Sequence, residues 1–269
     1  MKKIEKLQQI LLGLEKIAVA FSGGVDSTFL LIAAKETLGS KNVIAVTATA
    51  PNFAPDEIAY AKDMAVKLGI RHLYIEITLP ALFRSNQQDR CYHCKKAVFS
   101  ELMAELAEKT AAEGGGFVFC DGSNFDDISD YRPGSRAALE LGVRSPLREA
   151  ALTKKEIRTA LKERGVDIWD KPAFACLASR IPYGTQITDE MLSVVYDIEK
   201  MLRDKGYTQV RARLHKDVVR LELLPDEMQR LLADRDFSRI LSDYARERGF
   251  AYTTLDLCGY QMGSLNNVL

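Results

Sequence analysis

One stretch near the N-terminus constrains the fold more than any other part of the chain. It is a short apolar run, residues 17–21 (IAVAF), followed directly by residues 22–28 (SGGVDST). A short, continuous apolar run predicts a strand that is buried in a parallel sheet. The residues after it predict a tight turn and then a helix from Ser27 to about Leu38, which Gly39 can end. We therefore expect a strand, a loop and a helix in that order.

The composition of this loop suits a phosphate group. Two adjacent glycines let backbone amides approach a bound anion closely, and the N-terminus of the helix adds partial positive charge. The Walker pattern G-x-x-x-x-G-K-[ST] is absent, and the alternative is a glycine turn with incidental serines. Asp26 could hold a metal ion or order the loop. The candidate nucleotide-binding residues of the loop are Ser22, Gly23, Gly24, Asp26, Ser27 and Thr28.

Strand and helix patterns alternate over the first 170 residues. The pattern predicts helices over 1–14 and 56–67 and strands over 43–46, 73–77 and 117–120. Such alternation predicts right-handed crossovers and an α/β fold with a doubly wound parallel sheet. Ligands of these sheets bind beyond the carboxyl ends of the strands, which brings the loop together with residues 47–51 and 78–95.

The fourth predicted strand leads into an acidic and amide-rich stretch, residues 121–127 (DGSNFDD). Such groups at the carboxyl end of a strand suit a Mg²⁺ ion carried by ATP, because Mg²⁺ needs few protein carboxylates. The alternative is an Asx-rich turn with no ligand. A capping box at 153–156 predicts a purely structural helix that Gly165 ends.

A second unit begins at Thr188, after an irregular stretch at 170–184 that we interpret as a functional loop. Its pattern predicts a helix over 189–204, strands over 209–214 and 217–224, a helix over 226–248 and a strand over 250–256. Arg211 and Arg213 alternate with apolar residues, so they share one strand face. Two neighbouring arginines suit a phosphate, and a solvated strand face is the alternative.

The chain has five cysteines, an odd number at uneven spacing, which favours catalysis or metal binding over a disulfide framework. Three of them, Cys91, Cys94 and Cys176, fall outside the periodic segments. Three thiolates with an open fourth position could hold a [4Fe–4S] cluster. Cys120 and Cys258 are expected to be core residues.

Cys176 could also act alone. Lys171 and Arg180 flank it in the sequence, and nearby cations lower the pKa of a thiol and so raise its nucleophilicity. The resulting thiolate could attack an adenylated carboxyl carbon.

The composition excludes several classes of function. The chain carries 37 basic and 37 acidic residues, so no net field attracts nucleic acid, and we expect a small-molecule partner instead. No apolar run approaches the roughly eighteen residues of a membrane span. The N-terminus is charged and amphipathic, unlike a signal peptide, so we expect a cytoplasmic protein.

Four stretches together resemble the LarE family of ATP-dependent sulfurtransferases: Ser22–Thr28, Asp121–Gly134, Trp169–Gly184 and residues 255–266 (LDLCGYQMGSLN). The loop alone is similar to that of the PP-loop ATP pyrophosphatases. The resemblance implies that ATP adenylates a carboxylate of pyridinium-3,5-biscarboxylic acid mononucleotide. Sulfur attack then releases AMP and yields the precursor of the nickel-pincer cofactor of lactate racemase.

The resemblance leaves two sulfur sources open. Some family members give up the sulfur of the cysteine that matches Cys176, which becomes dehydroalanine. Others bind a [4Fe–4S] cluster through three cysteines, and Cys91, Cys94 and Cys176 also resemble the pattern of cluster-dependent tRNA thiolases. We favour the cluster. The alternatives on the same fold are tRNA thiolation and an ammonia-using adenylating ligase.

The resemblance also implies roles for residues and domains. It implies an ATP-binding domain at 1–170, a catalytic loop or linker at 171–187, and an α+β domain for substrate binding and homo-oligomer formation at 188–269. The further site residues are Ala20, Ala48 and Gly122 for ATP, Asp26 and Asp127 for Mg²⁺, and Arg211, Arg213 and Glu199 for the substrate phosphate.

Overall fold

The computed structural model describes residues 2–128, 133–171 and 175–261. It divides into two compact units, which we call unit 1 (Met1–Phe83 and Asp89–Phe174) and unit 2 (Arg84–Gln88 and Ala175–Leu269). The division after Phe174 lies within the expected linker, and the short segment Arg84–Gln88 groups with unit 2. Parts of three of the stretches that carry the family resemblance lie outside the described residues.

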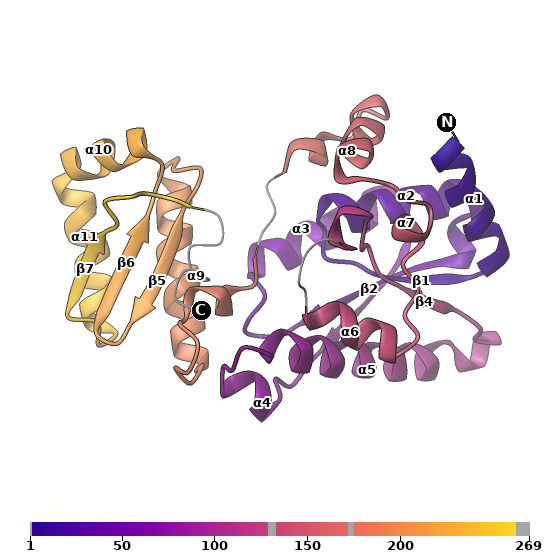
Figure 1. The fold of residues 1–269 in the computed structure, drawn as a ribbon, viewed down its shortest axis with the longest axis horizontal. Helices are drawn as coiled ribbons and strands as arrows, with labels where there is room; N and C mark the ends of the chain where they lie inside the picture. Colours follow the sequence, from indigo (N-terminus) through magenta and orange to yellow (C-terminus); the bar gives the residue numbers. More distant parts are fainter. Residues whose placement is uncertain (1, 129–132, 172–174, 262–269) are drawn as a thin grey trace. The chain divides into compact units, whose positions relative to one another are not determined.

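Unit 1 is built on a four-stranded parallel sheet, which confirms the predicted α/β class (Figure 1). Its strands are β1 (Ile17–Ala20), β2 (Val43–Thr49), β3 (Arg71–Glu76) and β4 (Val118–Cys120). The order is β3-β2-β1-β4, so β1 lies between β2 and β4. The loop after β1 therefore leaves the middle of the sheet at its carboxyl edge.

Helices cover both faces of this sheet (Figure 1). The α-helices of unit 1 are α1 (Lys2–Leu14), α2 (Val25–Leu38), α3 (Pro55–Leu68), α4 (Ala81–Arg84, whose last residue belongs to unit 2), α5 (Arg90–Thr110), α6 (Pro133–Glu140), α7 (Pro146–Glu149) and α8 (Lys154–Glu163). Its 3-10 helices are η1 (Ser40–Asn42), η2 (Ala111–Glu113), η3 (Asp126–Ile128) and η4 (Asp167–Asp170). Helices α5 and α6 pack on one face, and α1, α2, α3, α7 and α8 lie on the other.

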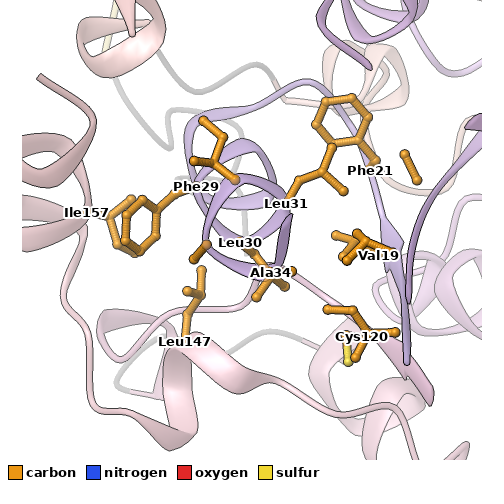
Figure 2. Close-up of a cluster of buried hydrophobic side chains, with 14 of the residues drawn as sticks. Val19, Phe21, Phe29, Leu30, Leu31, Ala34, Cys120, Leu147 and Ile157 are labelled. Atoms are coloured by element: carbon orange, nitrogen blue, oxygen red, sulfur yellow. The ribbon is translucent and has the colours of Figure 1, made fainter. Parts of the chain in front are cut away.

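Helix α2 is apolar on nearly every side because it is enclosed by the sheet and by other helices. Figure 2 shows Leu31 on the side of Val19 from β1 and of Phe21, which follows β1, and Phe29 on the side of Ile157 from α8. This core fixes the start of α2, and with it the loop, relative to the sheet.

The 21-residue helix α5 was not predicted. Its first turns are polar and charged, which hides the helical spacing of Val98, Phe99, Leu102 and Leu106 further along, all of which are buried. The expectation that Cys91 and Cys94 fall outside regular structure is therefore wrong.

Unit 2 has a three-stranded sheet in the order β5-β6-β7. Strand β5 (Arg211–His215) is antiparallel to β6 (Val218–Glu222), and β7 (Tyr252–Leu255) is parallel to β6. Its helices are η5 (Leu177–Arg180), α9 (Asp189–Asp204), α10 (Pro225–Ala233) and α11 (Arg235–Glu247). The single helix expected over 226–248 is two helices, because Asp234 ends α10 and its side chain caps α11 by accepting from Phe237 N.

Across the described helices, none combines the length and the apolar character that crossing a lipid bilayer would require.

Candidate active site

The loop after β1, residues 22–28, is here called the anion loop. Its polar groups bond to one another: Ser22 Oγ accepts from Gly24 N at 3.3 Å, and Ser27 Oγ donates to Gly24 O at 3.2 Å. The two hydroxyl oxygens lie 3.3 Å apart. Helix α2 begins at Val25, two residues earlier than predicted. The amides of its first turn and both hydroxyls therefore converge on one helix N-terminus, as a phosphate site requires.

Two glycines allow the anion loop to pack this tightly. Gly23 has φ +69°, and a Cβ there would lie 3.2 Å from atoms of Tyr60 and Ala61 on α3. Gly122, which follows β4, would place a Cβ 2.9 Å from the backbone nitrogen of Ser27. The loop is thus enclosed by α3 and by the end of β4, and neither position has room for a side chain.

Asp26 lies in the first turn of α2 and accepts from Lys154 Nζ at 2.6 Å through Oδ2. Its other oxygen, Oδ1, is buried and has no hydrogen-bond partner in the part of the chain that the structure describes. Burial raises the pKa of Asp26, and the negative charge of Asp127 adds to the rise. The hydrogen bond and charge of Lys154 and the side chain of Asn124 oppose it. A carboxylate with an unused buried oxygen beside a second carboxylate fits a Mg²⁺ ion that also binds ATP.

The stretch after β4 is held by its own hydrogen bonds. Asp127 Oδ2 accepts from Asn124 N at 2.9 Å. Asp121 accepts from Ser145 Oγ at 2.7 Å and from Lys95 Nζ at 3.0 Å. Burial alone would raise the pKa of Asp121, but Lys95 and the hydroxyl donors outweigh it and hold this pKa below its usual range. Asp121 therefore stays ionised and orders the turn that contains Gly122.

The two alanines expected near the adenine lie at the carboxyl edge of the sheet. Ala20 is the last residue of β1 and Ala48 the next to last of β2, on neighbouring strands. Both are half-buried and border the core under α5. The structure brings these positions and Gly122 to the same end of the sheet.

The three cysteines of the expected cluster lie in both units. Cys91 and Cys94 occupy the first turn of α5 in unit 1, and their spacing of three residues puts them on one helix face. Cys176 precedes η5 in unit 2. Cys91 and Cys176 are exposed and Cys94 is half-buried. Within residues 2–128, 133–171 and 175–261, no three His, Cys, Asp or Glu side chains gather as a metal site.

The two remaining cysteines differ from each other. Cys120 is buried in the core of unit 1, as expected, and burial raises its pKa to about 12. Cys258 was expected in the core and is exposed. That expectation is wrong because the chain has already left β7 at Leu255, and Cys258 lies in a turn in which its backbone nitrogen donates to Asp256.

Unit 2 contains a group of neighbouring arginines and carboxylates that we call the arginine cluster: Arg180, Arg211, Arg213 and Arg220 with Glu199 and Glu222. Arg180 and Glu199 are joined by two hydrogen bonds of 2.8 and 2.9 Å, and their side chains are only 1% and 2% exposed. Glu199 also accepts from Ala212 N at 3.1 Å. The predicted phosphate-site residue Glu199 is therefore the counterion of Arg180.

The two arginines predicted for a phosphate differ in their partners. Arg213 is joined to Glu222 by hydrogen bonds of 2.5 and 3.0 Å and to the carbonyl of Ser179 at 3.1 Å. Arg211 donates to its neighbouring carbonyl and lies over the Tyr260 ring at 5.1 Å. Among the described residues no carboxylate forms an ion pair with Arg211.

Burial and the charge of Arg180 lower the pKa of the Arg211 guanidinium. The charge of Glu199 opposes this, but Glu199 is paired with Arg180, so a phosphate would supply Arg211 with a counterion of its own. Of the predicted phosphate ligands, Arg211 is therefore the side chain best placed to gain from a bound anion. The alternative of a solvated strand face does not describe Arg213, which is buried.

Several cations of the site were missed by sequence reasoning. Lys154 starts the helix that was interpreted as purely structural, yet it bonds to Asp26 across 128 positions of the sequence. Lys95 bonds to Asp121 from the unpredicted helix α5. A lysine at the start of a helix carries no local signal of a distant partner. The position of Lys95, one residue after the C-x-x-C, was the available hint.

The sequence of this chain is similar to those of several known proteins. A family profile described as NAD synthase matches residues 4–106. A pyridinium-3,5-bisthiocarboxylic acid mononucleotide synthase of Lactiplantibacillus plantarum is 36% identical over 95% of this chain and 91% of its own. An uncharacterized protein of Synechocystis sp. is 42% identical over 99% of this chain and 98% of its own. An NH₃-dependent NAD⁺ synthetase of Fusobacterium nucleatum is 27% identical over 38% of this chain and 40% of its own.

Proposed function

The chain belongs to the LarE family, that of the pyridinium-3,5-bisthiocarboxylic acid mononucleotide synthase, and we propose that it catalyses the corresponding ATP-dependent sulfur insertion. The substrate is pyridinium-3,5-biscarboxylic acid mononucleotide, and the product is the thiocarboxylate precursor of the nickel-pincer cofactor. The observation that carries the proposal is the anion loop, whose amides and hydroxyls converge at the N-terminus of α2. It provides the phosphate site that adenylation of a carboxylate needs.

The first step is adenylation. A substrate carboxylate oxygen attacks the α-phosphorus of ATP, the bond to the β-phosphate breaks, and pyrophosphate leaves. The anion loop binds the departing phosphates through Gly23, Gly24 and the hydroxyls of Ser22 and Ser27, while strand-end backbone at Ala20 and Ala48 borders the adenine. The oxygen and nitrogen donors are fixed before the reaction, so they can stabilise the developing charge without reorganising.

Asp26 and Asp127 are the residues that would hold Mg²⁺. The unused buried oxygen of Asp26 and the nearby charge of Asp127 support this assignment. When bound, the ion would neutralise the phosphate oxygens of ATP. Lys154 then balances the remaining negative charge of Asp26.

The second step replaces oxygen by sulfur. A sulfur nucleophile attacks the adenylated carboxyl carbon and AMP leaves with its oxygen. Cys91, Cys94 and Cys176 would hold a [4Fe–4S] cluster, which when bound would supply a sulfide on its fourth iron. The alternative is direct attack by the Cys176 thiolate. Breaking its Cβ–Sγ bond with loss of the Cα proton then leaves dehydroalanine, and two chains are needed for the two carboxylates.

Unit 2 binds the substrate phosphate in this proposal. Arg211 is the main ligand, because it alone among the predicted phosphate residues lacks a paired charge in the described structure. Arg213 and Glu199 take part as members of the arginine cluster that fixes its surroundings. We also propose that this unit forms a homo-oligomer.

The function is tested by anaerobic turnover with ATP, Mg²⁺, sulfide and the dicarboxylate mononucleotide. We expect AMP, pyrophosphate and a product in which sulfur has replaced oxygen, identified by mass. Cys176→Ala should abolish this product, whereas Cys258→Ala, which alters another exposed cysteine, should retain it. An active Cys176→Ala enzyme contradicts the proposal. Amide formation with ammonium instead of sulfide would identify a ligase, and a gel shift with bulk tRNA would favour tRNA thiolation.

The sulfur source is tested by iron and acid-labile sulfide content after anaerobic reconstitution. About four irons per chain, lost in Cys91→Ala, Cys94→Ala and Cys176→Ala but kept in Cys258→Ala, are expected for the three-thiolate cluster. A chain without iron that becomes lighter by one hydrogen sulfide after turnover would instead identify Cys176 as the donor.

A further inference from the structure

Lys171 bonds to the anion loop from a distant part of the sequence. Its ammonium donates to Glu57 Oε2 at 3.0 Å and to the carbonyl oxygen of Gly23 at 3.4 Å, and lies 4.0 Å from the centre of the Tyr60 ring. Its side chain is 17% exposed. We propose that Lys171 is a positioning residue for the phosphates of ATP, acting through the peptide between Gly23 and Gly24.

That peptide is held at both ends. Its carbonyl oxygen accepts from Lys171, and its N–H, which belongs to Gly24, donates to Ser22 Oγ. A cation on the carbonyl polarises the peptide and makes the N–H a stronger donor. When a phosphate oxygen replaces Ser22 Oγ as acceptor, Lys171 continues to orient the same N–H. The anion loop contains no lysine. Lys171, which lies outside the loop, therefore acts on the phosphates by polarising the Gly23–Gly24 peptide.

The ammonium of Lys171 is itself fixed by its surroundings. The Glu57 carboxylate and the Tyr60 ring, both on α3, hold it by an ion pair and a cation–π contact. Its main chain is fixed as well, because Arg158 donates to the carbonyls of Trp169 and Lys171 at 2.6 and 3.0 Å. A cation anchored in this way needs little ordering when ATP binds, which favours positioning.

The same segment contains a reporter. Trp169 is the one tryptophan of the chain and lies two residues before Lys171. Its ring lies beneath Lys162, whose ammonium is 4.6 Å from the ring centre. A change at Lys171 upon nucleotide binding is therefore expected to alter the intrinsic tryptophan fluorescence.

This inference rests on the proposed function, since it requires ATP in the anion loop. The test is calorimetric binding of α,β-methylene-ATP and of adenosine to the full chain. Lys171→Met should weaken binding of the ATP analogue about tenfold or more, the loss expected for a charge-assisted contact, and leave adenosine unchanged. Lys171→Arg should recover most of the affinity. Lys162→Met, which removes a lysine beside Trp169 but not from the loop, should change neither ligand.

Glu57→Gln separates positioning from structural support. It removes the ion pair but keeps the ammonium of Lys171. It also removes a negative charge near the phosphates, so the ATP analogue should bind equally or more tightly. If Lys171→Met and Glu57→Gln weaken the analogue alike, or if Lys171→Met weakens adenosine equally, the ion pair is only structural and the proposal is wrong. Unchanged analogue binding by Lys171→Met overturns it too. A wild-type chain that binds no ATP analogue would instead refute the proposed function.

The fluorescence of Trp169 gives a second readout. The ATP analogue should change it in the wild-type chain and in Lys171→Arg, but not in Lys171→Met at concentrations that saturate binding. Adenosine should change it in none of them. An equal fluorescence response in Lys171→Met would contradict the link between the phosphates and Lys171.

Discussion

The anion loop and the arginine cluster handle charge in opposite ways. The loop bonds mostly to its own backbone and hydroxyls within six residues of sequence, and one oxygen of Asp26 is left without a partner among the described residues. The two most buried pairs of the arginine cluster, Arg180–Glu199 and Arg213–Glu222, instead join charges that are 19 and 9 residues apart. The loop can exchange its weak bonds for a ligand without exposing a buried charge. The cluster cannot, because each broken pair would leave an ion in the protein interior.

The largest effect on stability should follow from breaking the cluster at Glu199. In Glu199→Ala, Arg180 remains buried without its counterion and Ala212 N loses its acceptor. Loss of one partner of a buried pair costs about 3–5 kcal/mol, so we expect the free energy of unfolding to fall by that amount. Urea unfolding followed by circular dichroism measures it.

The control lies on the same helix. Asp204→Ala removes the exposed ion pair with Lys200 on α9, and exposed pairs contribute only about 0.5 kcal/mol. If Glu199→Ala and Asp204→Ala lower the free energy of unfolding equally, burial does not make the pairs of the arginine cluster more important for stability than an exposed pair. The contrast drawn between the cluster and the anion loop would then be wrong.

A smaller effect should separate the two arginines of β5. Arg213→Met removes the closer of the two arginines that pair with Glu222, which is fully buried, and we expect a loss of about 3 kcal/mol. Arg211→Met breaks no ion pair of the described structure and should change stability by about 1 kcal/mol or less. It should nevertheless weaken binding of the mononucleotide substrate at least about tenfold, the loss of one charge-assisted contact.

Urea unfolding and calorimetric substrate binding together measure this contrast. If Arg211→Met destabilises as strongly as Arg213→Met, or leaves substrate binding intact, Arg211 is a structural residue like its neighbour. The proposed phosphate site would then have to be sought elsewhere in unit 2.

The contrast between local bonds in the anion loop and distant pairs in the arginine cluster also explains which features could be predicted from the sequence. The strand, loop and helix around residues 17–38 were predictable because glycine turns, hydroxyl donors and helix ends depend on a few adjacent residues. The capping box at Thr153 and Glu156 was predictable for the same reason and is confirmed. Such interactions are encoded by spacing alone.

The rest could not be predicted because it depends on contacts between distant residues. Nothing near Asp26 indicates Lys154, and nothing near Arg180 indicates that Glu199 will neutralise it. The β5–β6 register places Arg211 opposite Glu222 and Arg213 opposite Arg220, yet Glu222 pairs diagonally with Arg213, and the register itself depends on where the turn falls. The break between α10 and α11 depends on a cap at Asp234 inside an otherwise continuous helical pattern.

The smallest effect on stability, with a large effect on activity, is expected for Asp26→Asn in the anion loop. The pKa of Asp26 is raised, chiefly by burial, so the folded chain retains this proton at pH values where the unfolded chain has lost it. The unfolding free energy of the wild type therefore falls as pH rises from about the ordinary value of 3.8 through the raised pKa. Asparagine cannot ionise, so Asp26→Asn should be as stable as wild type at low pH and equal or more stable at neutral pH.

Asp26→Asn should lower the activity, although it keeps or raises the stability. Asparagine lacks the negative charge that would hold Mg²⁺ beside the phosphates, and such a loss should lower the rate of pyrophosphate release at least about a hundredfold. The control is Asp63→Asn at an exposed position of α3, for which neither stability nor rate should change. Pyrophosphate release and urea unfolding between pH 4 and 8 measure the two effects. A variant that unfolds more easily at neutral pH would show that ionised Asp26 stabilises the fold through Lys154, as the pairs of the arginine cluster do.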